Sequence, residues 1–311
     1  MIEKYYDGAI EQVAAGLGTV EKNYLLVRYS GQFSVENLND TKQLEKNEDI
    51  FVQVHEFETG EITCAYEPYL TMICDGFRRY MTGTFEEFME TCDVYYLHRP
   101  VLLGYFNQDN TGREEIILLD EVAYEQERML AALERMLCAI ADRHPVLFVL
   151  NRFQLASKST MQLTARFLKC ENCNIGLVLG VSDIQAMPEF LVPDWEMLYE
   201  TLDDGSKIYH IGNSGRKKEE TIDDEKYVDY GSEKVYRKLQ NMVEFLDFDQ
   251  AAYYLETIER KIKFDNLLVD DAARFRMWLL FVKVSILRQD IPKALEICED
   301  LEKIHLAGKE E

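Results

Sequence analysis

The chain has 311 residues, of which 47% are hydrophobic and 29% are charged, so it can form one large globular domain or two ordinary ones. Its formal net charge of −23 repels phosphate backbones and anionic lipid, and we expect no nucleic-acid partner. No apolar stretch reaches transmembrane length, and the amino-terminal residues are too acidic for a signal peptide. We therefore expect no membrane association and a cytoplasmic protein, in which the seven scattered cysteines are reduced.

The amino-terminal half mixes helical and strand-like periodicities. Apolar residues recur every three to four positions in the predicted helices and alternate, or run continuously, in the predicted strands. The expected elements are a helix over 2–20, a strand over 23–30, a helix or loop over 34–46, a strand over 49–58, helices over 66–83 and 85–92, and a helix over 121–141.

The centre of the chain contains a short apolar run, "HPVLFVLNRFQLASKST", that stops abruptly at Asn151. Such a run predicts a buried strand ending at a sheet edge. A helix follows over 157–168, with Ser157 or Ser159 as its N-cap, and strands are predicted over 174–183 and 207–212. Strands alternating with helices indicate an α/β domain with a parallel sheet.

Beyond residue 212 the composition changes. The segment 213–232 is polar and highly charged, and it predicts a linker. The remainder is helical in pattern, with expected helices over 233–246, 249–263, 271–288 and 291–305. We therefore predict an α/β domain over 1–212, a polar linker over 213–232 and an all-α domain over 233–311.

The middle of the chain resembles the ATPase domains of STAND regulators, which belong to the AAA-like P-loop class. Their "PVLLVLDDLHWAD" is similar to "HPVLFVLNRFQLAS" here, and their "VLLVGTYR" is similar to "NIGLVLGVSD". An upstream piece, "CAYEPYLTMICDGFRRYM", is similar to their "PYAPFREALRRLL". The resemblance covers roughly residues 20–212 and implies a three-layer P-loop NTPase-like fold.

The nucleotide-site positions implied by this resemblance carry altered residues. The phosphate-loop position, "LLVRYSGQFSVENL", keeps Gly31 and Ser34 but lacks the G-K-[ST] that would hold phosphate and Mg²⁺. Asn151 and Gln154 stand where the family has an acidic pair, and Ser182 stands at the sensor position. We treat these five residues as vestigial nucleotide-binding positions.

Such changes have a chemical consequence, because phosphoryl transfer depends on positioning and electrostatic stabilisation of the phosphates. Without the lysine and the acidic pair, we expect no hydrolysis, no catalytic residue, no bound metal and no cofactor. The alternative is a nucleotide switch that binds ATP and Mg²⁺ through a noncanonical phosphate loop.

The carboxy-terminal helices resemble tetratricopeptide repeats. Trp278 and Ala294 are sixteen residues apart, the spacing between the aromatic residue of helix A and the alanine of helix B. Ala251 occupies the small position of an earlier helix, although its separation of 43 residues from Ala294 departs from the 34-residue period. The resemblance implies a protein partner bound through these helices.

The "CENC" motif at Cys170 and Cys173 is the other candidate for chemistry. A structural zinc site needs two further ligands, and the sequence offers no second pair at suitable spacing. We interpret the two cysteines as reduced thiols in a turn.

Together these patterns favour a catalytically degenerate, ATPase-like regulatory module of bacterial signal transduction that acts by protein–protein contact. A purely structural scaffold and the nucleotide switch are the alternatives, and self-association into a homo-oligomer stays open.

Overall fold

A computed structural model describes residues 2–17, 24–29, 49–58, 61–108, 121–170, 174–182, 187–203, 208–211, 229–265 and 267–307. The chain forms two compact units. The first, called the sheet unit here, comprises Met1–Glu61, Tyr66–Tyr95 and Leu130–Glu225. The second, called the helical unit, comprises Ile62–Ala65, Tyr96–Met129 and Lys226–Glu311.

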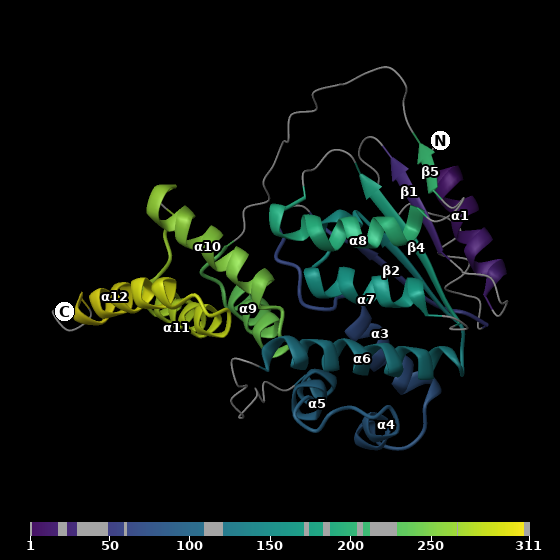
Figure 1. Cartoon of the computed structure of the whole chain (residues 1–311), viewed down its shortest axis with the longest axis horizontal. Coiled ribbons are helices and arrows are strands. Elements are labelled where there is room, and N and C mark those ends of the chain that lie inside the picture. The colour runs from purple at the N-terminus through teal and green to yellow at the C-terminus, as the bar shows by residue number, and fades with distance from the viewer. Residues whose placement is uncertain are drawn as a thin grey trace. The chain divides into compact units, whose positions relative to one another are not determined.

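The sheet unit is built on a parallel sheet, which in the described part of the chain has five strands in the order β2-β3-β4-β1-β5 (Figure 1). The strands are β1 Tyr24–Tyr29, β2 Phe51–Glu56, β3 Val146–Asn151, β4 Ile175–Ser182 and β5 Ile208–Ile211. This confirms the predicted α/β class. Because all strands are parallel, their carboxyl ends meet at one edge of the sheet.

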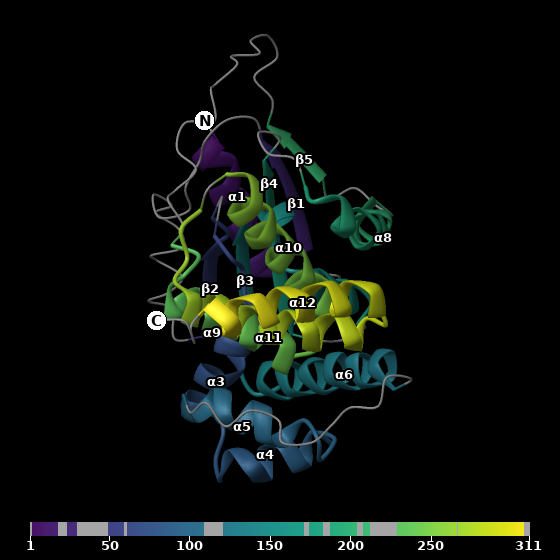
Figure 2. The ribbon, with the colours of Figure 1, turned by 90° about the vertical axis from the view of Figure 1, so that its left-hand side faces the viewer.

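Helices cover both faces of this sheet. α1 lies on one face, and α7 and α8 lie on the other (Figures 1 and 2). The helices outside the carboxy-terminal region are α1 Ile2–Gly16, α3 Tyr69–Tyr80, α4 Phe85–Thr91, α5 Arg99–Asn107, α6 Val122–Ala141, α7 Lys158–Lys169 and α8 Val192–Asp203, with 3₁₀ turns η2 Phe153–Leu155 and η3 Glu189–Leu191. Of these helices, α5 and α8 were not predicted.

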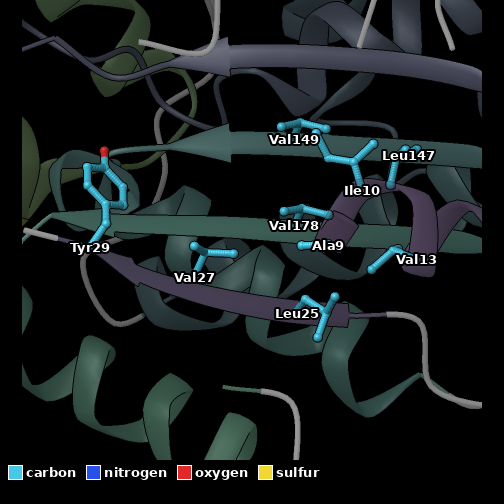
Figure 3. Packing of buried hydrophobic residues seen from close by; sticks show 9 residues of the cluster. All are labelled: Ala9, Ile10, Val13, Leu25, Val27, Tyr29, Leu147, Val149 and Val178. Atoms are coloured by element: carbon cyan, nitrogen blue, oxygen red, sulfur yellow. The ribbon is translucent and has the colours of Figure 1, made fainter. Parts of the chain in front are cut away.

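The core under α1 follows from the two-residue period of the strands. Alternate residues of β1, β3 and β4 point to the same face and meet the apolar side of α1 (Figure 3). Full burial of each large aliphatic side chain contributes about 1.5–3 kcal/mol. The buried residues of this cluster are Ala9, Ile10, Val13, Leu25, Val27, Tyr29, Leu147, Val149 and Val178.

On the opposite face, the buried ring of Tyr69 packs edge-on against Phe148 with centroids 4.7 Å apart. Its hydroxyl is hydrogen-bonded to Thr164 Oγ1 at 2.6 Å, so the polar end of this core residue has a partner. Ser157 is the N-cap of α7, and its side chain accepts a hydrogen bond from Thr160 N–H. Of the two predicted caps, Ser157 is therefore the one used.

The helical unit contains α5, the first turns of α6, and four carboxy-terminal helices. These are α9 Glu233–Glu244, α10 Phe248–Phe264, α11 Asp271–Leu287 and α12 Ile291–Ala307. All four were predicted. Distant parts of the sequence meet in this unit, since Lys238 Nζ donates to Ile62 O at 2.8 Å and Gln126 Nε2 donates to Leu246 O at 2.6 Å.

The unit therefore includes segments 62–65 and 96–129 in addition to the predicted all-α domain over 233–311. The predicted linker over 213–232 lies largely outside the described residues. Its role as a domain boundary stays a prediction.

Charged side chains tie α10 to α12 at the carboxy-terminal end of this unit. Lys263 Nζ contacts Glu259 Oε1 at 2.7 Å and Glu296 Oε1 at 3.1 Å, while Lys293 Nζ contacts Glu259 Oε2 at 2.7 Å. Glu259 is buried, so its two lysine partners compensate for the desolvation of its carboxylate.

Among the helices described, none combines the length and the apolarity that crossing a lipid bilayer demands.

Close packing around Gly176 on β4 yields a stability prediction. A Cβ atom at this position would lie 2.7 Å from Val13 Cγ1 and 3.0 Å from Leu147 Cδ1, and the valine has little rotamer freedom to move away. We expect Gly176→Ala to lower the free energy of unfolding by about 1–3 kcal/mol, measured by urea denaturation.

The matched control is Gly8→Ala in α1, where a Cβ atom would meet nothing within 4 Å. Alanine is the better helix former, so this variant should gain about 0.5–1 kcal/mol. Equal effects of the two substitutions would contradict the packing of α1 against β4.

Candidate functional site

The carboxyl edge of the sheet gathers the predicted positions that the structure describes. Asn151 is the last residue of β3, Gln154 lies in the η2 turn that follows, and Ser182 is the last residue of β4. Gly31 and Ser34 lie outside the described residues. The structure thus brings three of the five predicted residues to one edge.

Tyr29, the last residue of β1, occupies the same edge. Its hydroxyl donates a hydrogen bond to Asn151 Oδ1 at 2.7 Å, and both side chains are buried. Because β4 lies between β1 and β3, the tyrosine side chain reaches past one strand to contact the next but one. Figure 3 shows the ring at the end of β1, with its hydroxyl directed toward the β3 side of the sheet.

The environment of this hydroxyl favours its neutral form. Burial disfavours the phenolate and raises the pKa of Tyr29 to about 12, although the positive charge of Arg152 nearby acts in the opposite direction. Tyr29 is therefore a neutral hydrogen-bond donor at physiological pH.

Gln154 links the turn after β3 to the end of β4. Its Oε1 accepts the backbone N–H of Ser182 at 3.3 Å, a long hydrogen bond. Its Nε2 is buried and makes no hydrogen bond to any residue that the structure describes. The end of β4 is thus joined to the turn after β3 through one half of a side-chain amide.

The nearest charges at this edge neutralise each other. Arg152 follows Asn151 with a left-handed backbone, φ 53°, and its Nε lies 3.4 Å from Glu56 Oε1 at the end of β2. Glu56 is the one carboxylate among the last residues of β1 to β4, and it is engaged by this arginine.

These donors do not fit a magnesium–nucleotide site. Mg²⁺ in such sites is held by carboxylates and substrate phosphates in octahedral geometry. At this edge the described side chains are a phenol, two amides, a serine and the Glu56–Arg152 pair, and the described residues contain no cluster of three His, Cys, Asp or Glu able to hold a metal ion.

Sequence reasoning missed Tyr29 as part of this edge. The available signal was the alternation Leu25, Val27, Tyr29, which places the tyrosine last on the face that packs against α1. Of the "CENC" motif, Cys170 is half-buried and Cys173 lies outside the described residues, so the structure does not test the interpretation as a turn.

The helical unit offers a second candidate site, a groove of about 310 Å³ between α9 and α11. Its lining combines apolar side chains with charged side chains of both signs. The lining residues are Tyr236, Gln240, Val243, Glu244, Arg276, Leu279, Leu280 and Lys283. The volume falls at the lower end of the range typical of ligand pockets.

Comparison with known proteins adds no name to either site. No family model matches the chain, and neither a curated protein nor a solved structure matches it significantly. The structure on its own defines the class: an α/β unit with a parallel sheet, accompanied by a helical unit.

The hydrogen bond from Tyr29 gives a direct test of the closed edge. Tyr29→Phe removes the hydroxyl and leaves the buried Asn151 oxygen without this donor, so we expect a loss of about 1–2 kcal/mol in the free energy of unfolding. Tyr199→Phe is the control, because the Tyr199 hydroxyl makes a long 3.5 Å contact with Arg28 in an exposed setting. A loss as small as the control's would refute a buried Tyr29 hydrogen bond.

The raised pKa of Tyr29 also predicts a pH dependence. Its folded value, about 12, exceeds the ordinary value of 10.0, so its contribution to stability is complete below pH 10 and is lost as the pH rises from 10 through 12. The difference in unfolding free energy between the wild type and Tyr29→Phe should therefore shrink above pH 10 in urea titrations. A difference independent of pH would contradict the neutral, buried hydroxyl.

Proposed function

We propose that the sheet unit is a STAND-type ATPase domain that has lost its catalytic groups, and that the chain works as a regulatory module by protein–protein contact. The observation that carries the proposal is the hydrogen bond from Tyr29 to Asn151, which fills the edge where such a domain holds its nucleotide.

Strand arrangement supports the relationship to a P-loop domain. The resemblance assigns the phosphate loop to the end of β1, the acidic pair to the end of β3 and the sensor to the end of β4. These three stations can cooperate only if their strands are neighbours, and β4 does lie between β1 and β3. Ligands of open α/β sheets bind at the carboxyl ends of the strands, which is where all three stations lie.

The residues at these stations support the loss of catalysis. A phosphoryl-transfer site needs a cation for the phosphates and carboxylates for the metal. Here Asn151 Oδ1 accepts a hydrogen bond from Tyr29, and Gln154 Oε1 accepts one from the backbone of Ser182. The carboxylate of Glu56 is paired with Arg152. Among the described residues these oxygen atoms serve the fold, and none of these contacts leaves a carboxylate for Mg²⁺.

The helical unit supports a contact role. Several large apolar side chains are exposed on it, and the groove between α9 and α11 lies on the same unit. Exposed apolar side chains near a groove are typical of protein interaction sites when they gather in a patch. The exposed residues on α10 to α12 and their connection are Phe264, Leu268, Leu279, Ile286, Ile291 and Leu295.

One observation favours a second candidate, a nucleotide-binding switch without hydrolysis. The buried Gln154 Nε2 has no partner within the described part of the chain and lies at the carboxyl edge. A phosphate oxygen is an acceptor that such a donor could use. A single amide lacks the charge of the family's lysine, so the filled site is the stronger candidate.

Nucleotide titrations test the proposal. We expect isothermal calorimetry with Mg²⁺ and ATP to give no binding heat, and phosphate-release assays to give no Mg²⁺-dependent turnover. Turnover above the buffer rate would overturn the filled-site proposal.

Gln154→Met is the control that separates the two candidates, because it keeps the length of the side chain and removes its amide. Binding without turnover that disappears in this variant would establish the switch. Binding that survives it would lie elsewhere on the chain and would count against both candidates at this edge.

A further inference from the structure

α11 and α12 both expose large apolar side chains at the surface of the helical unit. α11 has no single apolar side: large apolar residues lie all round its axis, between Arg274, Arg276 and Lys283. Its inner residues, Trp278 among them, are buried, yet Leu279 is 50% exposed and Ile286 is 39% exposed. On α12, Ile291 is 48% exposed and Leu295 is 61% exposed.

The groove beside α11 is lined by two cations and by one acid, Glu244. Leu279, Leu280 and Val243 supply its apolar lining, while Arg276 and Lys283 stand two helical turns apart along α11. Arg276 already pairs with Glu233 in α9 at 2.8 Å. Lys283 is exposed and pairs with no acid among the residues that the structure describes.

The outer side of α12 has the complementary character. Ile291, Leu295, Glu299 and Glu302 follow one another at spacings of four, four and three residues, which places them on one side of the helix. All four are exposed, and neither glutamate makes an ion pair in the described part of the chain. This side is apolar in its first two turns and acidic in the next.

α11 and α12 carry net charges of opposite sign. α11 carries three cations, Arg274, Arg276 and Lys283, against the single acid Asp271. α12 carries four acids, Glu296, Glu299, Asp300 and Glu302, against two lysines. An apolar groove with an exposed lysine and an acidic, apolar helix side therefore exist on the same chain.

We propose that a second copy of this chain is the partner: the outer side of α12 from each copy docks in the α9–α11 groove of the other. In this dimer the contact is isologous: each copy offers its groove to the helix of the other, and the pair closes with two-fold symmetry. Leu295 and Ile291 enter the apolar part of the groove, and the glutamates face Lys283, in the manner of an amphipathic helix bound in a groove.

Electrostatics explain why the contact would be specific. Two chains that each carry a net charge of −23 repel each other in most orientations. Placing the glutamates of α12 beside Lys283 offsets this repulsion locally at two equivalent contacts. The inference rests on the proposed contact role of the helical unit, and it is independent of whether the sheet unit binds nucleotide.

Sedimentation equilibrium on the full chain tests the proposal. We expect a reversible monomer–dimer equilibrium, and Leu295→Glu should raise the dissociation constant by about tenfold or more, as for an interface anchor. The high exposure of Leu295 means that this variant should fold, which circular dichroism would verify. Met197→Glu on α8 is the matched control, because Met197 is also an exposed apolar residue but lies in the sheet unit.

Charge reversal identifies the two surfaces. Lys283→Glu should weaken the dimer, and so should the pair Glu299→Lys with Glu302→Lys. The latter pair reduces the net negative charge, so general repulsion alone would predict the opposite result. A chain carrying all three changes should dimerise like the wild type, and an equimolar mixture of the two weakened variants should form the mixed dimer.

Glu196→Lys with Glu200→Lys, two exposed acids on α8, matches the change in net charge and should leave the dimer intact. A wild type that stays monomeric at all concentrations overturns the proposal, as does a dimer that Leu295→Glu leaves unchanged. Either result would leave the nucleotide titrations untouched, so failure of the dimer and failure of the filled site can be told apart.

Discussion

The hydrogen bond from Tyr29 to Asn151 is the interaction on which the character of the sheet unit depends. It joins the end of β1 to the end of β3 past the strand between them, and both side chains are buried. A buried amide oxygen without a donor would destabilise the fold, and the Tyr29 hydroxyl supplies that donor to Asn151. The carboxyl edge, where ligands of open α/β sheets bind, thus holds buried core side chains at the ends of β1 and β3.

The sheet unit and the helical unit differ in which side chains are paired internally and which are exposed. In the sheet unit, Gln154 meets the backbone of Ser182, and Arg152 meets Glu56. In the helical unit, the buried carboxylate of Glu259 is satisfied by two lysines, but apolar side chains of α11 and α12 are left in solvent. The polar contacts of the first unit lie within its own fold, while the second leaves large apolar side chains exposed.

Much of this architecture follows from local pattern, and the rest depends on contacts between distant residues. The buried strands have continuous apolar runs, and Asn151 marks the end of one, so their positions were predictable. α5 and α8 were missed because each has a proline in its first turn, and proline is as typical of turns as of helix starts. The role of Tyr29 depends on strand order, and the inclusion of 96–129 in the helical unit depends on long-range packing, neither of which a single sequence encodes locally.

Amide hydrogen exchange in the presence and absence of Mg²⁺ and ATP tests the central claim most directly, because it reports on the backbone of the edge itself. If the edge is closed by its own side chains, protection at residues 150–155 and 180–182 will be the same in both conditions. A rise in protection confined to these residues on adding nucleotide would contradict the account, since it would show a ligand at the place that Tyr29 and Asn151 are said to fill.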